Sequence, residues 1–172
     1  DGGGLRSRSA WSSVEADYVA SIAWGDVDGD GDLDLAVGNS GKPNRMYRND
    51  GGMLTSSAVW SSVEKDETNS VAWGDVDGDG DLDLAVGNGD LMAEPSRLYR
   101  NDGGVLATSA VWSTAEADNS RSIAWADVDG DGDLDLAIGN YGQPSRLYRN
   151  ESGVLTASAD WSTVESDDTR SV

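Results

Sequence analysis

Short runs of alternating large and small residues recur along the chain and predict β-strands. In the first run, large Ile22 and Trp24 alternate with small Ala23 and Gly25. A second run, at 33–38, alternates Leu and Val with Asp and Ala. Side chains of one strand point to opposite faces in turn, so each predicted strand has two different faces.

Two more strands are predicted after these runs, at 45–49 and from about Leu54 to Trp60. They are separated by Asp50-Gly51-Gly52, in which glycine tolerates the positive φ of a tight hairpin turn. Together the four strands form one antiparallel, up-and-down unit.

The whole unit recurs three times, with a period of about 50 residues that is typical of propellers, solenoids and arrays. Ala23–Asn39 is identical to Ala72–Asn88, and Ala124–Asn140 differs only at Ala126 and Ile138. The tryptophans follow the same period in two series, which are Trp24, Trp73 and Trp125, and Trp11, Trp60, Trp112 and Trp161. We therefore predict an all-β fold of four-stranded β-propeller blades.

The predicted organisation is a single repeat array over residues 1–172. Residues 1–17 are expected to form the outer strand of a preceding blade, followed by blades at 18–66, 67–118 and 119–172, the last with a C-terminal outer strand. Because propellers close with four to eight blades, three blades and spare outer strands make an incomplete propeller. The missing blades are expected from a longer parent chain, or from other subunits in a homo-oligomer or filament.

Each repeat contains the same nine residues, Asp-Val-Asp-Gly-Asp-Gly-Asp-Leu-Asp, between its first two strands. Side-chain oxygens at positions 1, 3, 5 and 9, with a backbone carbonyl at position 7, would surround a metal ion. All-oxygen, carboxylate-rich ligation favours calcium over magnesium, so three Ca²⁺ sites are predicted. The predicted ligands are Asp26, Asp28, Asp30, Asp32, Asp34, Asp75, Asp77, Asp79, Asp81, Asp83, Asp127, Asp129, Asp131, Asp133 and Asp135.

The loops differ from EF-hands, because position 12 is Val37, Val86 or Ile138 in place of glutamate. The alternative to metal binding is an acidic, solvated turn, which three identical copies disfavour.

Composition narrows the choice of partners. The net charge is −20, and the sequence pI is about 4.1, so nucleic acid and anionic membranes are disfavoured as partners. Hydrophobic residues make up 37% of the chain and phenylalanine is absent, so we expect bound ions to help stabilise a thin core. No apolar run suits a transmembrane helix, and no signal peptide is seen. The chain starts at Asp1 without Met, so we expect a processed protein or a piece of a longer one.

The absence of Cys and His removes disulfides, the usual zinc ligand and the commonest general base. No serine lies in a nucleophile-elbow context, so the chain is predicted not to be an enzyme.

Six arginines at the third strands, Arg45, Arg48, Arg97, Arg100, Arg146 and Arg149, are expected to pair with nearby acidic groups, although a clamp for an anionic ligand is an alternative. The tryptophans are expected to pack between blades, with stacking on sugars the alternative for the outer series.

The chain resembles the FG-GAP and VCBS repeat families, whose calcium-loop blades also occur in integrin α-subunit propellers. The resemblance rests on Ala72–Asn88 and on the Arg-Leu-Tyr-Arg-Asn-Asp-Gly-Gly that starts at Arg97, and it covers essentially the whole chain. Trp-Gly, or Trp125-Ala126, replaces Phe-Gly, and Gly-Asn replaces Gly-Ala-Pro, which places the chain nearer the VCBS branch. The resemblance implies calcium in the blade loops and an extracellular propeller.

In a four-stranded blade, the identical Asp loops and the hairpin turns share one edge. The opposite edge carries loops that vary between repeats, at 40–44, 89–96 and 141–145 and before each first strand. The leading hypothesis is an extracellular or cell-surface calcium-binding propeller segment for adhesion or ligand recognition, in which the varied edge contacts a protein or a glycan. The alternatives are a building block of a self-assembling surface filament or oligomer, and a propeller appendage of a secreted enzyme.

Overall fold

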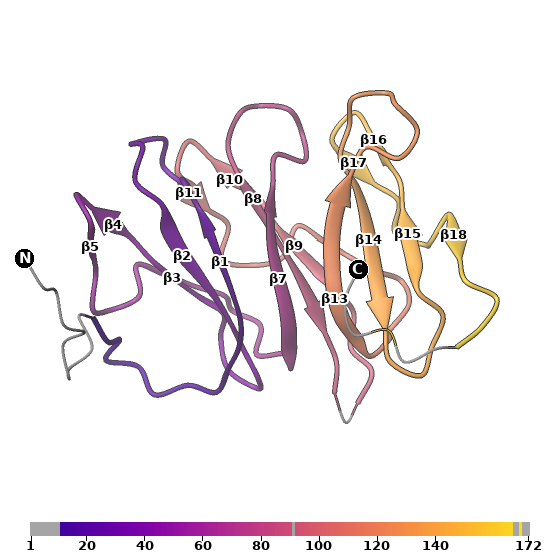
Figure 1. The fold of residues 1–172 in the computed structure, drawn as a ribbon, viewed down its shortest axis with the longest axis horizontal. Helices are drawn as coiled ribbons and strands as arrows, with labels where there is room; N and C mark the ends of the chain where they lie inside the picture. Colours follow the sequence, from indigo (N-terminus) through magenta and orange to yellow (C-terminus); the bar gives the residue numbers. More distant parts are fainter. Residues whose placement is uncertain (1–10, 91, 167–168, 170–172) are drawn as a thin grey trace, which may run out of the picture.

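The computed structural model describes residues 11–90, 92–166 and 169. Within these residues the helices and strands assigned are all β-strands, as predicted, joined by turns and loops, and the sheets are antiparallel (Figure 1). The described residues therefore include no helix that could cross a membrane.

Each repeat forms one four-stranded sheet whose strands follow chain order from the inner to the outer edge (Figure 1). The first sheet contains β1 (Val19–Gly25), β2 (Asp34–Asn39), β3 (Arg45–Tyr47) and β6 (Trp60–Ser61). The second contains β7 (Thr68–Gly74), β8 (Asp83–Asn88), β9 (Arg97–Tyr99) and β12 (Trp112–Ser113). The third contains β13 (Ser120–Ala126), β14 (Asp135–Asn140), β15 (Arg146–Tyr148) and β18 (Trp161–Ser162). This is the predicted up-and-down order.

A two-stranded hairpin is inserted between the third and fourth strands of each sheet. The hairpins are β4 (Asn49–Asp50) with β5 (Met53–Leu54), β10 (Asn101–Asp102) with β11 (Val105–Leu106), and β16 (Asn150–Glu151) with β17 (Val154–Leu155). Gly51 and Gly52 have φ of 62° and 82°, which is the conformation of a two-residue primed turn. The predicted hairpin turn is therefore present.

The outer strand differs from the prediction of one continuous strand from about Leu54 to Trp60. The chain leaves the ladder between Thr55, whose N–H donates to the Arg48 carbonyl, and Val59, whose N–H donates to the Met46 carbonyl. In between, the Ala58 N–H donates to Glu15 at 3.0 Å. A side chain from outside the sheet thus replaces the ladder partner, and only Trp60–Ser61 remains as outer strand.

The two faces of each sheet are complementary to each other. We call the face with Ile22, Trp24, Leu35 and Tyr47 in the first repeat, and its equivalents in the others, the large face. The opposite face, with Ala23, Ala36, Met46 and Trp60 in the first repeat, we call the small face. On the small face, the two inner strands carry small side chains and the two outer strands carry bulky ones. Neighbouring sheets can therefore approach at their inner strands and spread at their outer strands.

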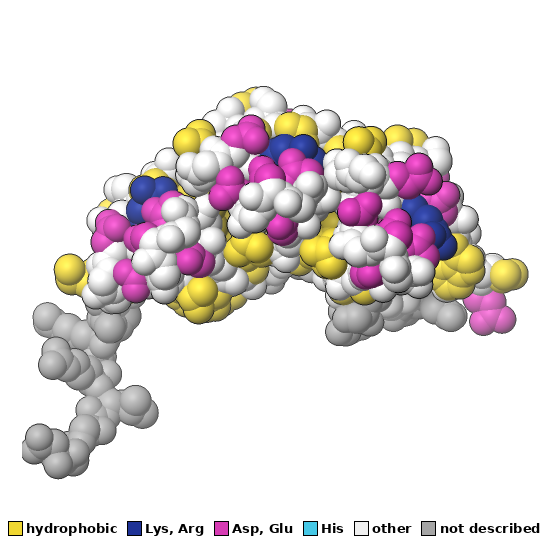
Figure 2. All heavy atoms as spheres, turned by 90° about the horizontal axis from the view of Figure 1, so that it is seen from above, with side chains coloured by type: hydrophobic (Ala, Val, Ile, Leu, Met, Phe, Trp, Pro, Cys, Tyr) yellow, Lys and Arg dark blue, Asp and Glu magenta, His cyan; other side chains and the backbone are white. Residues whose placement is uncertain are grey.

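The large face of each later repeat packs on the small face of the repeat before it. Val71, Leu84, Val86 and Tyr99 of the second repeat share a buried core with Ala36, Met46 and Trp60 of the first. The equivalent core between the second and third repeats contains Leu98, Ile123, Leu136 and Tyr148. The inner strands β1, β7 and β13 are consecutive neighbours, and the repeats follow an arc (Figures 1 and 2).

Glycines on the small face make room for the inner tryptophans. A Cβ atom on Gly25 would lie 2.8 Å from Trp73 Cδ1, and one on Gly74 would lie 2.8 Å from Trp125 Cδ1 and Nε1. These distances are far below van der Waals contact, so the glycines are required for the packing as it stands. The predicted packing between blades is confirmed for Trp73 and Trp125, which lie against the two cores between repeats. It does not hold for Trp24, which is 51% exposed on the large face of the first repeat.

Three of the four outer tryptophans also pack across repeat boundaries, whereas Trp161 is 57% exposed. The ring of Trp60 meets Tyr99 edge-on at 5.3 Å, and Trp112 meets Tyr148 in the same way at 5.6 Å. Trp11 makes the equivalent contact with Tyr47 at 5.2 Å. Trp11 thus occupies the place that the outer strand of a preceding blade would take. Residues 11–17 of that predicted outer strand are described and form no strand, since β1 is the first described strand and starts at Val19. Residues 1–10 lie outside the described residues, as do 167, 168 and 170–172 of the last predicted blade.

A glutamate and an aspartate precede the first strand of each sheet and contact the outer strands of that sheet. Glu64 accepts hydrogen bonds from the Tyr99 hydroxyl and the Ala110 N–H, both at 3.1 Å. Asp66 pairs with Arg97. Equivalent Arg–Asp pairs join Arg45 to Asp17 and Arg146 to Asp118, so the expected pairing of these arginines with acidic groups is confirmed.

Candidate metal-binding loops

The last aspartate of each nine-residue motif is a structural anchor. Asp34 is fully buried at the start of β2, where one carboxylate oxygen accepts the Val27 N–H at 3.2 Å and the other accepts the Asn49 N–H at 2.8 Å. Asp83 and Asp135 make the same two contacts in their own repeats. Burial raises the pKa of Asp83 to about 6, against the opposing effect of the two N–H donors. Each loop is therefore tied at its end to the sheet below it.

The loops turn through glycine and internal hydrogen bonds. Gly31, at position 6, has a φ of 92°, and its N–H donates to Asp26 at 3.0 Å. The matching bonds, from Gly80 to Asp75 and from Gly132 to Asp127, measure 3.0 and 3.1 Å. A left-handed residue at this point folds the carboxylates of the loop back toward one another.

The turn gathers several carboxylates at one place in each loop. Oxygen atoms of Asp26, Asp28 and Asp30 lie within 4.8 Å of one another, and so do those of Asp75, Asp77 and Asp79. In the third loop the gathered set is Asp127, Asp129 and Asp135. These three acidic clusters can hold a metal ion, since like charges this close are disfavoured without a cation among them.

Two buried oxygens of these clusters have no hydrogen-bond partner, Oδ1 of Asp26 and Oδ1 of Asp77. A buried carboxylate oxygen without a donor is costly, and coordination of a hard cation would satisfy it. The donor set of the loops, carboxylate oxygen with no nitrogen or sulfur, suits such a cation. The residues therefore fit the metal that the sequence predicts.

The aspartate side chain at position 7 of each loop accepts a hydrogen bond from the hairpin of the same repeat. Asp32 Oδ2 accepts the N–H of Gly51 in the β4–β5 turn at 2.6 Å. Asp81 and Gly103, and Asp133 and Ser152, repeat this contact at 2.5 and 2.7 Å. The carboxylate thus fastens the loop to its own hairpin. Only the backbone carbonyl of position 7 was predicted as a ligand.

Two residues that follow the third strand were not assigned to the loops from the sequence. Arg48 Nε lies 3.0 Å from Oδ2 of Asp28, at position 3, and Arg100 and Arg149 contact Asp77 and Asp129 in the same way. These pairs confirm the general expectation of arginine–acid pairing and show where it occurs. The signal was the Arg-Asn dipeptide that recurs at a fixed distance from every motif.

The asparagine of that dipeptide connects neighbouring repeats. Asn101 Nδ2 donates to the Leu82 carbonyl of its own loop at 3.2 Å and to the Val27 carbonyl of the preceding loop at 2.9 Å. Asn150 joins the second and third loops through Val76 and Leu134. The partners lie 74 residues apart, so the alternation within a strand carries no information about this contact.

The acidic loops gather on one edge of the arc, where acidic groups beside arginine are visible in Figure 2. The opposite edge is formed by the loops that vary between repeats. There Arg121 pairs with Asp90 at 2.6 Å and lies 5.6 Å from the ring centre of Tyr141. Bridges between Ser40 and Glu67, and between Glu94 and Asp118, connect further loops on this edge.

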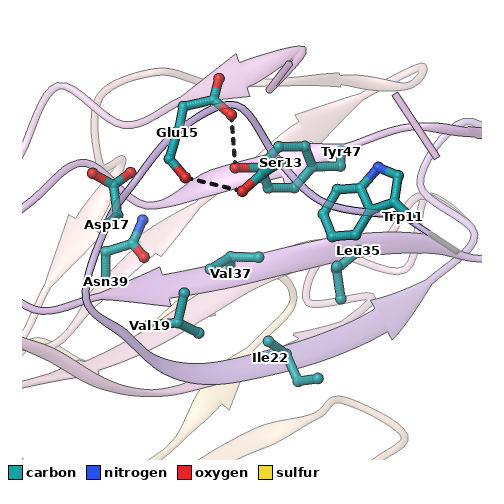
Figure 3. A pocket seen from close by; sticks show the side chains of 10 residues that line it. All are labelled: Trp11, Ser13, Glu15, Asp17, Val19, Ile22, Leu35, Val37, Asn39 and Tyr47. Carbon is teal, nitrogen blue, oxygen red and sulfur yellow. Dashed lines mark hydrogen bonds between the residues drawn. The ribbon is translucent and has the colours of Figure 1, made fainter. Parts of the chain in front are cut away.

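The large face of the first repeat contains a cavity of about 240 Å³ (Figure 3). Its wall includes Trp11, Ile22, Leu35 and Tyr47, and Glu15 receives the Tyr47 hydroxyl at 3.1 Å. In the second repeat, Val71 and Leu84 occupy the positions of Ile22 and Leu35 and are buried by the repeat before them. The cavity is thus an open boundary between repeats and not a separately built site.

Comparison with known proteins gives one family match. A family model described as FG-GAP-like repeat matches residues 26–86 and 87–138. A search of curated proteins finds no match to the chain.

Proposed function

The chain belongs to the FG-GAP repeat family, and from this premise we propose that it is a non-enzymatic, calcium-binding β-propeller segment of an extracellular or cell-surface protein. Calcium rigidifies the loops between the first two strands of each repeat, and the varied edge recognises a protein or a glycan. The family match and the repeated antiparallel sheets support the propeller part of this proposal.

One observation supports calcium most strongly. The loops gather carboxylates within 4.8 Å of one another, and Asp26 and Asp77 each keep a buried oxygen without a donor. Ca²⁺ accepts six to eight oxygen ligands in flexible geometry, whereas Mg²⁺ prefers a strict octahedron with retained water. A flexible, glycine-containing loop of aspartates therefore favours calcium.

Bound calcium would supply a multivalent positive charge that draws the loop carboxylates together. The position of each loop is set by hydrogen bonds within the protein. Asp34 and its equivalents fix the end of each loop, and Asp32 and its equivalents fasten the loop to a hairpin. The ion thus acts on a loop that is already tied to the sheet, and it would stiffen the edge of the blade.

The varied edge is the proposed recognition surface. Its loops differ in length and sequence between repeats, whereas the opposite edge repeats the same residues. Recognition sites commonly lie on loops that a rigid scaffold positions. The pairing of Arg121 with Asp90 gives this edge a defined shape at the boundary of the second and third repeats.

A second candidate function is a building block of a self-assembling filament or oligomer. The favouring observation is an apolar surface at each end of the arc. Ile22 and Trp24 on the first large face are 55% and 51% exposed, although their equivalents are covered in later repeats. Trp161 at the other end is 57% exposed.

Calcium binding is tested by thermal melting of the whole chain in calcium, in magnesium and in EDTA. We expect calcium to raise Tm well above its value in EDTA and magnesium to raise it less. Equal Tm in all three solutions would refute the calcium role.

Recognition is tested with a glycan array and with light scattering, both in calcium. Binding of the small species to defined glycans supports the recognition role. Calcium-dependent growth into large particles, with no bound glycan, supports the building-block role instead.

A further inference from the structure

We propose that the arginine that follows each third strand limits the calcium affinity of its own loop and keeps that loop folded when calcium is scarce. Each of these arginines binds one oxygen of the aspartate at position 3 and leaves the other oxygen for an ion. The inference rests on the proposed calcium binding and adds to it the residues that set the strength of that binding. They are Arg48, Arg100 and Arg149.

The same ion pair occurs in all three repeats. In each repeat the guanidinium contacts Oδ2 of the position 3 aspartate, and the nitrogen-to-oxygen distances in the first two repeats are 3.0 and 2.5 Å. Arginine beside acidic groups is visible on the edge that carries the loops (Figure 2). The pairs are Arg48 with Asp28, Arg100 with Asp77, and Arg149 with Asp129.

The pairing leaves the second oxygen of each aspartate, Oδ1, free of a charged partner among these pairs. In the second loop, Oδ1 of Asp77 is buried and has no hydrogen-bond partner. In the other two loops, Oδ1 of Asp28 and of Asp129 accepts a long hydrogen bond of 3.3 Å from the N–H at position 5. All three aspartates belong to the gathered carboxylate clusters. Position 3 can therefore offer Oδ1 to an ion while Oδ2 binds the guanidinium.

An ion at Oδ1 and a guanidinium at Oδ2 are positive charges on opposite sides of one carboxylate. Their separation is within about one Debye length, roughly 8 Å at physiological ionic strength, so salt screens their repulsion only in part. This repulsion weakens ion binding. Without an ion, the same guanidinium offsets the repulsion among the gathered carboxylates. It therefore stabilises the ion-free loop more than the ion-bound loop.

The sign of the effect depends on whether the arginine is also needed to shape the loop. In the first loop, Gly31 donates to Asp26 at 3.0 Å, and Gly51 donates to Asp32 at 2.6 Å. The buried Asp34 accepts a backbone N–H at each of its oxygens. These hydrogen bonds hold the loop without the arginine, so removal of the arginine changes mainly the charge beside the ion.

Calorimetric titration with calcium tests the inference on the first loop. The whole chain carries Asp75→Asn and Asp127→Asn, so that the first loop dominates the binding, and this protein is the parent. Arg48→Gln removes the positive charge, whereas Arg48→Lys keeps it. Arg121→Gln is the matched control, since it removes the same charge on the opposite edge, where Arg121 pairs with Asp90.

We expect Arg48→Gln to bind calcium several-fold more tightly than the parent, and we expect the gain to shrink in concentrated KCl. Arg48→Lys and Arg121→Gln should bind with nearly the affinity of the parent. In EDTA, Arg48→Gln should melt below the parent, and calcium should raise its Tm by more than it raises that of the parent. An arginine with only a packing role would lower Tm in EDTA without tightening calcium binding.

An unchanged or weaker affinity in Arg48→Gln, in a protein that melts cooperatively in EDTA, would overturn the inference. An equal gain in Arg121→Gln would also overturn it, because the cause would then be the net charge of the protein. If Arg48→Gln does not fold, Arg149→Gln in a chain with Asp26→Asn and Asp75→Asn repeats the test on the third loop. An unmodified chain that takes up no calcium would refute the proposed function itself, and the inference with it.

Discussion

The fit of Trp125 against Gly74 gives a sharp test of how the repeats pack. A methyl group added at Gly74 would lie 2.8 Å from both Cδ1 and Nε1 of Trp125 and 3.0 Å from Cγ. The indole ring is rigid, so the whole ring or the sheet that carries it must shift. Gly74→Ala is therefore predicted to destabilise the protein.

The size of the effect follows from two opposing contributions. Overfilling a packed core costs about 1–3 kcal/mol. Replacing glycine by alanine in a strand normally stabilises by about 0.5–1 kcal/mol, because the unfolded chain loses freedom. Since three ring atoms lie within 3.0 Å of the added methyl group, we expect a cost in the upper part of the range and a net loss of about 1–2 kcal/mol. For a chain of this length that corresponds to a fall in Tm of about 2–8 °C.

The assay is thermal melting of the whole chain followed by tryptophan fluorescence, in EDTA so that ion binding does not contribute. Ala126→Gly is the matched control, because Ala126 occupies the equivalent strand position in the third repeat and is exposed. The control measures the effect of strand propensity at a position against which no tryptophan of another described repeat packs. We expect it to lower Tm slightly. A Gly74→Ala protein that melts at or above the unmodified chain would refute the proposed packing.

Two further predictions each compare a residue in a buried or half-buried contact with a control residue that is more exposed. Trp60 is 7% exposed in the first core, so Trp60→Ala should lower the free energy of unfolding by about 3–5 kcal/mol in a guanidinium titration. Trp161 is 57% exposed, so Trp161→Ala should lower it far less. Similar losses in both variants would contradict this. Asp66→Asn breaks the half-buried pair with Arg97 and should cost about 1–3 kcal/mol in the same titration. Its control Asp90→Asn breaks the more exposed pair with Arg121 and should cost under about 1 kcal/mol, so an equal or greater loss in the control would argue against a structural role of the Asp66 pair.

Much of the fold could be predicted because its signals are local. Alternation at Ile22 and Trp24 and at Leu35 and Val37 identifies the inner strands, and Asp50-Gly51-Gly52 identifies the hairpin. The sequence period then predicts one four-stranded sheet for each of the three repeats. These patterns act over a few residues, so a single sequence reveals them.

The outer strand was harder to predict because its partner lies elsewhere. Glu15 captures the Ala58 N–H from 43 residues away and interrupts the ladder. The link from Asn101 to Val27 spans 74 residues, and it exists only because two repeats are docked. No strand pattern contains that information.

The acidic clusters were predictable as motifs but not as environments. The sequence gives the same nine residues three times, and nothing in them distinguishes Val27 from Val128. The structure buries the first, against which the second repeat packs, and leaves the second 48% exposed. Packing between repeats thus creates differences that the loop sequence does not contain.

Native mass spectrometry measures directly whether the aspartate loops bind calcium. The whole chain is compared, in calcium, with a variant that carries Asp26→Asn, Asp75→Asn and Asp127→Asn together. We expect up to three bound calcium ions on the unmodified chain, one for each loop, and none retained by the variant under the same conditions. Equal calcium uptake by the two proteins, or no uptake by either, would contradict it.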